Sequence, residues 1–302
     1  MDRILVTGSN GQLGKCLVER LKNQVDLLAL DRKQLDITDI EAVNHIIKQF
    51  EPDVVINAAA YTAVDKAESD QEMASLVNID GVRNLAIACE EISAVLLHIS
   101  TDYVFDGNKN LESLYIEEDE VNPQSIYGKT KLQGEIVAQK YCKKTIILRT
   151  AWVFCEYGNN FVKTMLRLAQ SHRELGIVAD QFGAPTYAGD IADTLISIVD
   201  KIRTHQSIQY GIYHFTGYPY VSWYEFAEAI FLEVKKYNVL NTIPKLNAIK
   251  TIDYPTPAKR PTNSKLNMDK IKEVDKKARI AYLVNNKKCL ISARKINLLL
   301  KY

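Results

Sequence analysis

Three glycines near the N-terminus join an apolar run to an amphipathic segment. They are Gly8, Gly11 and Gly14, and the apolar run before them spans residues 3–7. Glycine permits a tight turn and lets backbone N–H groups approach an anion, while the helix that follows adds a favourable field for negative charge. The GxxGxxG spacing therefore predicts a strand, a phosphate-binding turn and a helix, with Gln12 and Leu13 at the same turn.

Short apolar runs alternate with amphipathic segments through the first half of the chain. The predicted strands are 3–7, 26–31, 53–57, 94–100 and 145–149, and the predicted helices are 12–22, 40–50, 73–91 and 127–141. Such alternation is typical of a parallel sheet covered on both faces. We predict an α/β fold with a Rossmann-type, doubly wound parallel sheet, whose ligands bind at the carboxyl ends of the strands.

After Trp152 the pattern becomes mixed, which predicts a smaller α/β substrate-binding lobe. We assign residues 1–150 to a dinucleotide-binding core, to which 188–218 return, and residues 151–187 and 219–275 to the lobe. Residues 276–302 form an atypical basic tail with eight Lys or Arg and no Asp or Glu. We expect the tail to pack loosely, to contact the acidic body through charge and to contribute no catalytic group.

Composition excludes several classes of protein. Without the tail, the chain has 30 basic and 37 acidic residues, so its net charge of −7 gives no case for nucleic-acid binding. No apolar stretch reaches the ~18 to 20 residues that span a membrane, and no secretory leader is recognisable. The five cysteines include no CxxC pair and the histidines form no ligand-spaced cluster, so we expect no metal site and a cytoplasmic protein.

A tyrosine and a lysine lie four residues apart on a predicted helix. They are Tyr127 and Lys131, and Thr101 ends the fourth predicted strand, at the carboxyl edge of the sheet. A nearby ammonium group favours the phenolate of a tyrosine, whose pKa is ordinarily ~10, and so eases proton donation. A threonine hydroxyl can bind the same carbonyl oxygen. The three residues predict protonation of a ketone as hydride arrives at its carbon.

The residues that follow the second and third strands suit a dinucleotide. Asp31 lies where an acid ordinarily binds the adenosine ribose hydroxyls, and Arg32 could contact a 2′-phosphate, so NADPH and NADH both remain open. Asp36 belongs to a possible adenine-side loop at 35–39, for which a helix N-cap at Thr38 or Asp39 is the alternative. The small side chains of Ala58, Ala59 and Ala60 would let a flat cofactor pack closely.

Taken together, these stretches resemble the dTDP-4-dehydrorhamnose reductase family of extended short-chain dehydrogenases. The matching stretches are TGSNGQLG (7–14), LDITD (35–39), NAAAYTAVDKAE (57–68), ISTDYVFDG (99–107), YGKTKLQGE (127–135), RTAWVF (149–154), NNFVKTML (159–166), VADQFGAPTY (178–187) and SWYEFA (222–227). They recur in order from residue 3 to about residue 275.

The resemblance implies reduction of dTDP-4-dehydro-β-L-rhamnose to dTDP-L-rhamnose with NADPH or NADH, in the supply of rhamnose for surface polysaccharide. It implies that Tyr127 is the acid, that Lys131 also binds the nicotinamide ribose and that Thr101 holds the carbonyl. Asp102, Tyr103 and Trp152 would line the sugar pocket. Some members of the family use Mg²⁺ to bridge a dimer through glutamates, but Cys16 stands at one such place here and a thiol is a poor Mg²⁺ ligand. We therefore expect no bound metal, and a monomer or weak homodimer.

Two other functions stay open at this point. One is the reduction of a different 4-ketosugar nucleotide, because the sequence does not determine the configuration of the product. The other is a non-catalytic role like that of the regulatory β subunit of methionine adenosyltransferase, which has this fold and a YxxxK motif. That subunit lacks the tryptophan found here at Trp152.

Overall fold

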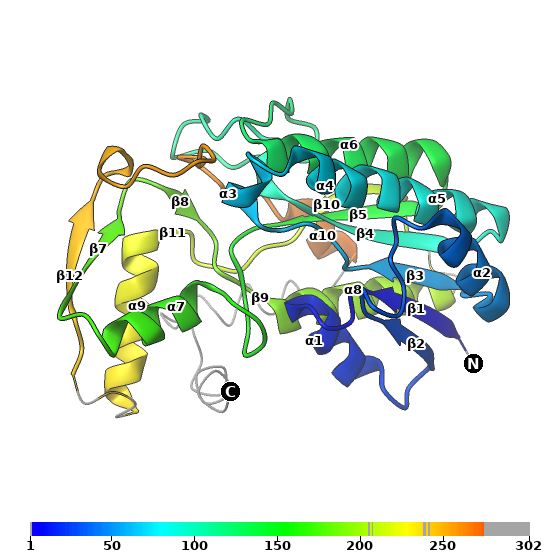
Figure 1. The fold of residues 1–302 in the computed structure, drawn as a ribbon, viewed down its shortest axis with the longest axis horizontal. Coiled ribbons are helices and arrows are strands. Elements are labelled where there is room, and N and C mark those ends of the chain that lie inside the picture. Colours follow the sequence, from blue (N-terminus) through cyan, green and yellow to red (C-terminus); the bar gives the residue numbers. More distant parts are fainter. Residues whose placement is uncertain (1, 205, 207, 238–239, 241, 275–302) are drawn as a thin grey trace.

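The centre of the molecule is a sheet of six parallel strands (Figure 1). The computed structural model describes residues 2–204, 206, 208–237, 240 and 242–274. The strands lie in the order β2 (Asp26–Leu30), β1 (Arg3–Thr7), β3 (Val54–Asn57), β4 (Val95–Thr101), β5 (Thr145–Thr150) and β10 (Gly211–His214). Strand order reverses between β1 and β3, which makes the carboxyl end of β1 a point where ligands bind in such sheets.

Helices cover both faces of this sheet (Figure 1). On one face lie α1 (Gln12–Leu21) and α8 (Ala188–Arg203), and on the other α2 (Ile40–Phe50), α5 (Gly81–Glu91) and α6 (Ile126–Tyr141). Strand β1 shows why both faces need cover: Ile4 and Val6 join the core under α1 and α8, while Leu5 joins the core under α2 and α5. The predicted fold class is confirmed.

The helix predicted at 73–91 begins earlier and contains an irregular turn. It comprises α4 (Gln71–Ser75), a π-helical turn η1 (Leu76–Asp80) and α5. From the π turn, Asn78 donates hydrogen bonds to the carbonyl oxygen of Tyr61 and to Oγ1 of Thr130 on α6, and accepts one from the backbone N–H of Tyr61. This contact holds the π-helical turn against α6 next to Lys131, and π turns are frequent at functional sites.

A second group of elements lies beyond the carboxyl edge of the sheet, on the left in Figure 1. It contains α7 (Phe161–Ala169), the parallel pair β7 (Glu174–Val178) and β12 (Lys245–Ile249), and α9 (Trp223–Lys236), which begins in a capping box of Ser222 and Glu225. The short elements are β6 (Val153–Phe154), β8 (Phe182–Gly183), β9 (Thr186–Tyr187), β11 (Val221–Ser222), α3 (Val64–Ala67), η2 (Asp102–Val104), η3 (Thr251–Asp253) and α10 (Asp269–Val274). The division into core and lobe at the residues given above stays a prediction.

Among the described residues, no helix has both the length and the apolar composition needed to cross a bilayer. The proposed basic tail, 276–302, lies outside the described residues.

Candidate active site

The glycine loop is packed so closely that two of its glycines leave no room for a side chain. Gly8 has a φ of +68°, and a Cβ there would lie 2.7 Å from the backbone nitrogen of Ala59. A Cβ on Gly14 would meet the carbonyl oxygen of Gly8. The N-cap of α1 is Gly11, so no side chain caps the first backbone N–H groups of that helix. Those N–H groups can receive an anion at the carboxyl end of β1.

The residues after β2 are tied to this loop and to one another. Asp31 follows β2, accepts a hydrogen bond from the side chain of Asn10 and also accepts the backbone N–H groups of Lys33 and Gln34. The guanidinium of Arg32 is 69% exposed and lies 3.8 Å from the carboxylate of Asp36. Asp31 therefore joins the adenosine-side turn to the glycine loop, while Arg32 remains available to a ligand in solvent.

Asp36 supports a turn. Its Oδ1 accepts hydrogen bonds from both the backbone N–H and the hydroxyl of Thr38. Burial opposes ionisation, but these two hydrogen bonds and the charge of Arg32 together lower the pKa of Asp36. Asp39 caps α2 by accepting the N–H of Ala42 at 3.1 Å, so the helix-cap alternative for this segment is confirmed at Asp39.

Thr101 and Tyr127 meet at the carboxyl edge of the sheet. Thr101 is the last residue of β4, and Tyr127 lies in the first turn of α6, whose N-cap Ser125 accepts the N–H of Gly128 at 3.1 Å. The Thr101 hydroxyl lies close enough to the Tyr127 phenol to lower the pKa of that phenol. A Cβ on Gly128 would meet the carbonyl oxygen of Tyr103, so this glycine lets α6 approach the strand end. The hydroxyls predicted to act on one carbonyl oxygen are therefore adjacent.

The predicted effect of Lys131 on Tyr127 is not what the structure shows. Burial raises the pKa of Tyr127, the hydrogen bond with Thr101 opposes this rise, and the neighbouring Asp102 and Tyr103 add to it. The sequence expectation of a lowered pKa was wrong because burial, which the spacing does not reveal, dominates. A phenol with a raised pKa stays protonated at neutral pH, which is the form a proton donor needs.

Lys131 is buried beneath the same edge. Its Nζ donates a hydrogen bond of 2.7 Å to the carbonyl oxygen of Ile99 and lies 3.5 Å from Nε2 of His98. Burial lowers the pKa of Lys131 to about 8, and the charge of Glu135, one turn farther along α6, opposes that change. The amino group is therefore held in place and titrates near neutral pH.

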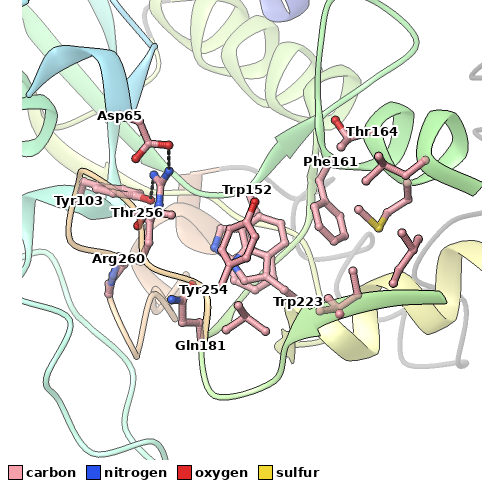
Figure 2. Close-up of a pocket in the computed structure, with 17 residues that line it drawn as sticks. Asp65, Tyr103, Trp152, Phe161, Thr164, Gln181, Trp223, Tyr254, Thr256 and Arg260 are labelled. Carbon is pink, nitrogen blue, oxygen red and sulfur yellow. Dashed lines mark hydrogen bonds and ion pairs between the residues drawn. The ribbon is translucent and has the colours of Figure 1, made fainter. Parts of the chain in front are cut away.

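A cavity of about 540 Å³ opens beside these residues, between the sheet edge and the second group of elements (Figure 2). The residues that line it are Asp65, Tyr103, Trp152, Phe161, Thr164, Met165, Leu168, Leu175, Gly176, Ile177, Val178, Gln181, Trp223, Tyr254, Thr256, Arg260 and Pro261. The cavity reaches the catalytic edge through Tyr103, whose ring lies 5.5 Å from that of Tyr127. Its size and mostly apolar wall suit a small organic ligand.

Trp152 forms part of that wall. Its indole stacks on that of Trp223 with ring centroids 3.5 Å apart. The indole also packs directly against Gly183, where a Cβ would lie 2.5 Å from Cε2 of Trp152. Trp152 has a φ of +48°, an unusual conformation for a bulky residue and one associated with functional sites. Figure 2 shows both indoles at the middle of the cavity.

Of the residues that line the cavity, only Tyr103 and Trp152 were identified from the sequence, and Asp65 and Arg260 make a polar contact that it did not reveal. Arg260 binds Asp65 with an Nη2–Oδ2 distance of 2.6 Å and donates from Nη1 to the hydroxyl of Tyr103 at 2.9 Å (Figure 2). Asp65 and Arg260 lie 195 residues apart in the chain, so no local sequence pattern around either residue reveals their contact.

Asp102 is placed differently from the expectation that it lines the sugar pocket. It is buried, it accepts the Thr101 hydroxyl at 2.9 Å and it also accepts the hydroxyl of Ser264. Burial raises the pKa of Asp102 to about 6, and these two hydrogen bonds oppose the rise. Asp102 is not among the residues that line the cavity, and its carboxylate contacts Thr101 and Ser264 instead. Contact of Asp102 with a sugar stays a prediction.

The described part of the chain contains no group of three acidic, histidine or cysteine side chains that could hold a metal ion. Cys16 is fully buried on the core side of α1, where its thiol contacts that of Cys155. The expectation of no Mg²⁺ bridge stays a prediction.

Comparison with known proteins gives a consistent result. Residues 1–291 match the family model described as RmlD substrate binding domain. This match extends beyond Asp275, near which the resemblance in motifs was expected to stop. The chain is 53% identical over 275 residues to a dTDP-4-dehydrorhamnose reductase of Aggregatibacter actinomycetemcomitans, covering 90% of this chain and 93% of the relative.

Two solved structures of proteins with the same description are also similar. The one from Clostridium acetobutylicum has a TM-score of 0.82 and 39% identity, covering 99% of this chain and 98% of that one. The one from Bacillus anthracis, in complex with NADP, has a TM-score of 0.81 and 36% identity, covering 94% and 99%.

Proposed function

The chain belongs to the dTDP-4-dehydrorhamnose reductase family, and we propose that it reduces the C4 ketone of dTDP-4-dehydro-β-L-rhamnose to dTDP-L-rhamnose with NADPH or NADH. The observation that carries this proposal is the adjacent pair of Thr101 and Tyr127, with Lys131 one turn away, between a phosphate-binding turn and a cavity. The protein is an NAD(P)H-dependent oxidoreductase, and we propose that it acts in the cytoplasm.

The residues present fit a dinucleotide. The packed turn of Gly8, Gly11 and Gly14 and the uncapped start of α1 would hold the diphosphate, with Gln12 and Leu13 at the same turn. Asp31, Arg32 and Asp36 lie on the adenosine side, and Ala58, Ala59 and Ala60 offer a surface without bulky side chains. When bound, the reduced nicotinamide supplies the hydride.

The protein's own part in the reaction is to bind the ketone and to provide a proton. The Thr101 hydroxyl would turn from Asp102 to donate a hydrogen bond to the C4 oxygen, and Tyr127 would give that oxygen its phenolic proton. Lys131 would hold the nicotinamide ribose. A phenol, whose ordinary pKa is ~10, is protonated at neutral pH, so Tyr127 carries its proton when charge develops on the C4 oxygen.

The sugar nucleotide occupies the cavity of Figure 2. Tyr103 and Trp152 lie against the sugar at the end nearest Tyr127, and the stacked indoles of Trp152 and Trp223 form an apolar wall. Arg260, held by Asp65 and Tyr103, supplies a positive charge in this wall for the diphosphate.

Replacing Arg32 with alanine is expected to weaken NADPH binding while it leaves NADH binding almost unchanged. The guanidinium is exposed and can leave its 3.8 Å contact with Asp36 for a 2′-phosphate, which NADH lacks, whereas Asp31 favours the ribose hydroxyls of NADH. We therefore expect the wild-type protein to use both cofactors, within about tenfold of each other in kcat/KM, since a single exposed contact is worth about 1 kcal/mol. Dissociation constants of the two cofactors measure the effect. Equal weakening of both would show that Arg32 does not bind the 2′-phosphate.

Replacing Trp152 with alanine is expected to raise the KM for the sugar nucleotide and to change stability little. The indole is a cavity wall rather than part of the closed core, and Trp223 remains beneath it. Trp152→Phe keeps an aromatic ring and should restore part of the affinity. A loss of ~3 to 5 kcal/mol in the free energy of unfolding, the cost of truncating a buried tryptophan, would instead identify a core residue.

The proposed function is tested with two dTDP-4-ketosugars that differ in configuration at one ring carbon. The purified protein should oxidise NADPH faster with dTDP-4-dehydrorhamnose than with the second sugar. A preference for the second sugar would assign the chain to a different reductase. Cofactor and sugar binding without any oxidation of NADPH would favour a regulatory role.

A further inference from the structure

A chain of buried polar side chains runs beneath the proposed catalytic lysine and joins β1, β3, β4 and α6. The Thr7 hydroxyl donates to Oδ1 of Asn57 at 2.7 Å, Nδ2 of Asn57 lies 3.1 Å from Nδ1 of His98, and Nε2 of His98 lies 3.5 Å from Nζ of Lys131. Thr7, Asn57 and His98 are completely buried, and Lys131 is 2% exposed. The mechanism proposed above uses only Lys131 of these four.

The orientation of Asn57 is determined by its neighbours. Its Oδ1 receives the backbone N–H of Ala59 at 3.1 Å, and a backbone N–H can only donate, so the oxygen of the amide must lie on that side. The NH₂ group therefore faces His98, and Nδ1 of His98 must accept a hydrogen bond. In a neutral imidazole whose Nδ1 is an acceptor, the hydrogen is on Nε2.

His98 therefore presents an N–H, not a lone pair, to Lys131. A protonated lysine has three donors and no acceptor, so it cannot form a hydrogen bond with that N–H. Its protons must be directed elsewhere, and one is donated to the carbonyl oxygen of Ile99. Only the neutral amine could accept the N–H of His98.

We infer that His98, fixed by Asn57 as the tautomer with hydrogen on Nε2, is a positioning residue that directs the protons of Lys131 away from the core and toward the cofactor side of the site. The inference rests on the proposed role of Lys131. It extends the catalytic apparatus to Asn57 on β3, which orients the imidazole on β4, which in turn orients the amino group on α6.

The charged and titratable groups around Lys131 come from three elements. On α6 itself, Glu135 favours the ammonium and is bound in turn by Arg149 of β5 through two hydrogen bonds. On β4, burial and the proximity of Lys131 lower the pKa of His98, so the imidazole stays neutral. Because the N–H of the neutral His98 points at Lys131, it favours the neutral amine over the ammonium. The pKa of Lys131 is therefore lowered by His98 as well as by burial.

Nuclear magnetic resonance of the full chain labelled with ¹⁵N in histidine tests the tautomer directly. His98→Phe identifies the resonances of His98 by their disappearance. We expect a non-protonated Nδ1 and a protonated Nε2, with no change over the pH range in which Lys131 titrates. A protonated Nδ1 would overturn the inference. This measurement does not depend on catalysis, so inactivity toward the sugar would refute the proposed function and leave this result standing.

Asn57→Asp tests the effect on Lys131. One oxygen of the new carboxylate can still accept from Thr7 and Ala59. The other can accept a hydrogen bond from Nδ1–H of His98, which moves the imidazole hydrogen from Nε2 to Nδ1. The lone pair of Nε2 then faces Lys131. The pKa of Lys131, followed by the chemical shift of its side chain, should rise by about one pH unit or more. The alkaline limb of the kcat/KM profile should move with it.

The double variant Asn57→Asp/His98→Phe is the matched control, because it keeps the new carboxyl group and removes the imidazole. A clearly smaller rise in the pKa of Lys131 than in Asn57→Asp supports the inference. An equal rise in both variants would show that the carboxyl group acts alone and would overturn it. A kcat/KM profile that fails to follow a shifted Lys131 would instead refute the proposed role of Lys131 in the reaction.

Discussion

Replacing Tyr127 with phenylalanine is expected to lower kcat by about 10²- to 10⁴-fold, which is the usual contribution of general acid catalysis. The change removes the phenolic hydroxyl, keeps the ring against Tyr103 and leaves the glycine loop untouched. Cofactor affinity should therefore be nearly unchanged. Steady-state kinetics with the sugar nucleotide and a separate titration with NADPH measure the two effects.

Tyr115→Phe is the control for this variant. Tyr115 is also buried, and its hydroxyl is hydrogen-bonded to Asp106, but it lies outside the proposed site. Its kcat should stay close to that of the wild type. A Tyr127→Phe variant within about threefold of the wild type would rule out Tyr127 as the proton donor, because general acid catalysis contributes far more.

Replacing Glu135 with alanine is expected to cost about 3 to 5 kcal/mol of the free energy of unfolding. Arg149 binds both oxygens of Glu135, from Nε at 2.9 Å and from Nη2 at 2.7 Å, and the two side chains are 2% and 1% exposed. Nη1 of Arg149 has no hydrogen-bond partner among the described residues. Removing Glu135 would leave the guanidinium charge buried and unpaired, and denaturant unfolding measures the loss.

Two variants separate this explanation from a general effect of losing a glutamate. Glu91→Ala breaks an ion pair with Lys48 in which the side chains are 47% and 62% exposed, and it should cost less than about 1 kcal/mol. In Glu135→Ala/Arg149→Met the buried charge is gone, so this double variant should be more stable than Glu135→Ala alone. If the double variant is the less stable of the two, the buried charge is not the source of the loss.

The central sheet could be predicted because its strands are buried on both faces. Strands β1 and β3 therefore read as continuous apolar runs, and β1 leads through the glycine turn directly into the amphipathic helix α1. The pairing of the strands in the second group gives no such signal. Strand β12 pairs with β7 about seventy residues earlier, and β8 and β11 have two residues each, so their strand structure arises from tertiary pairing.

The site was predictable where its chemistry depends on local spacing. Thr101, Tyr127 and Lys131 were identified from strand ends and from the helical repeat, and the structure brings Thr101 and Tyr127 together. The raised pKa of Tyr127 was not predictable, because it depends on burial by other elements. The contact of Arg260 with Asp65 and the link from Asn57 through His98 to Lys131 likewise join residues that are far apart in sequence.

The central claim is tested most directly by incubating the purified protein with dTDP-4-dehydro-β-L-rhamnose and NADPH and identifying the product. We expect one equivalent of NADPH to be oxidised for each dTDP-L-rhamnose formed, and Tyr127→Phe to abolish most of this turnover. Folded protein that binds NADPH and the sugar nucleotide but oxidises no cofactor, or that yields the epimeric alcohol at C4, would contradict it.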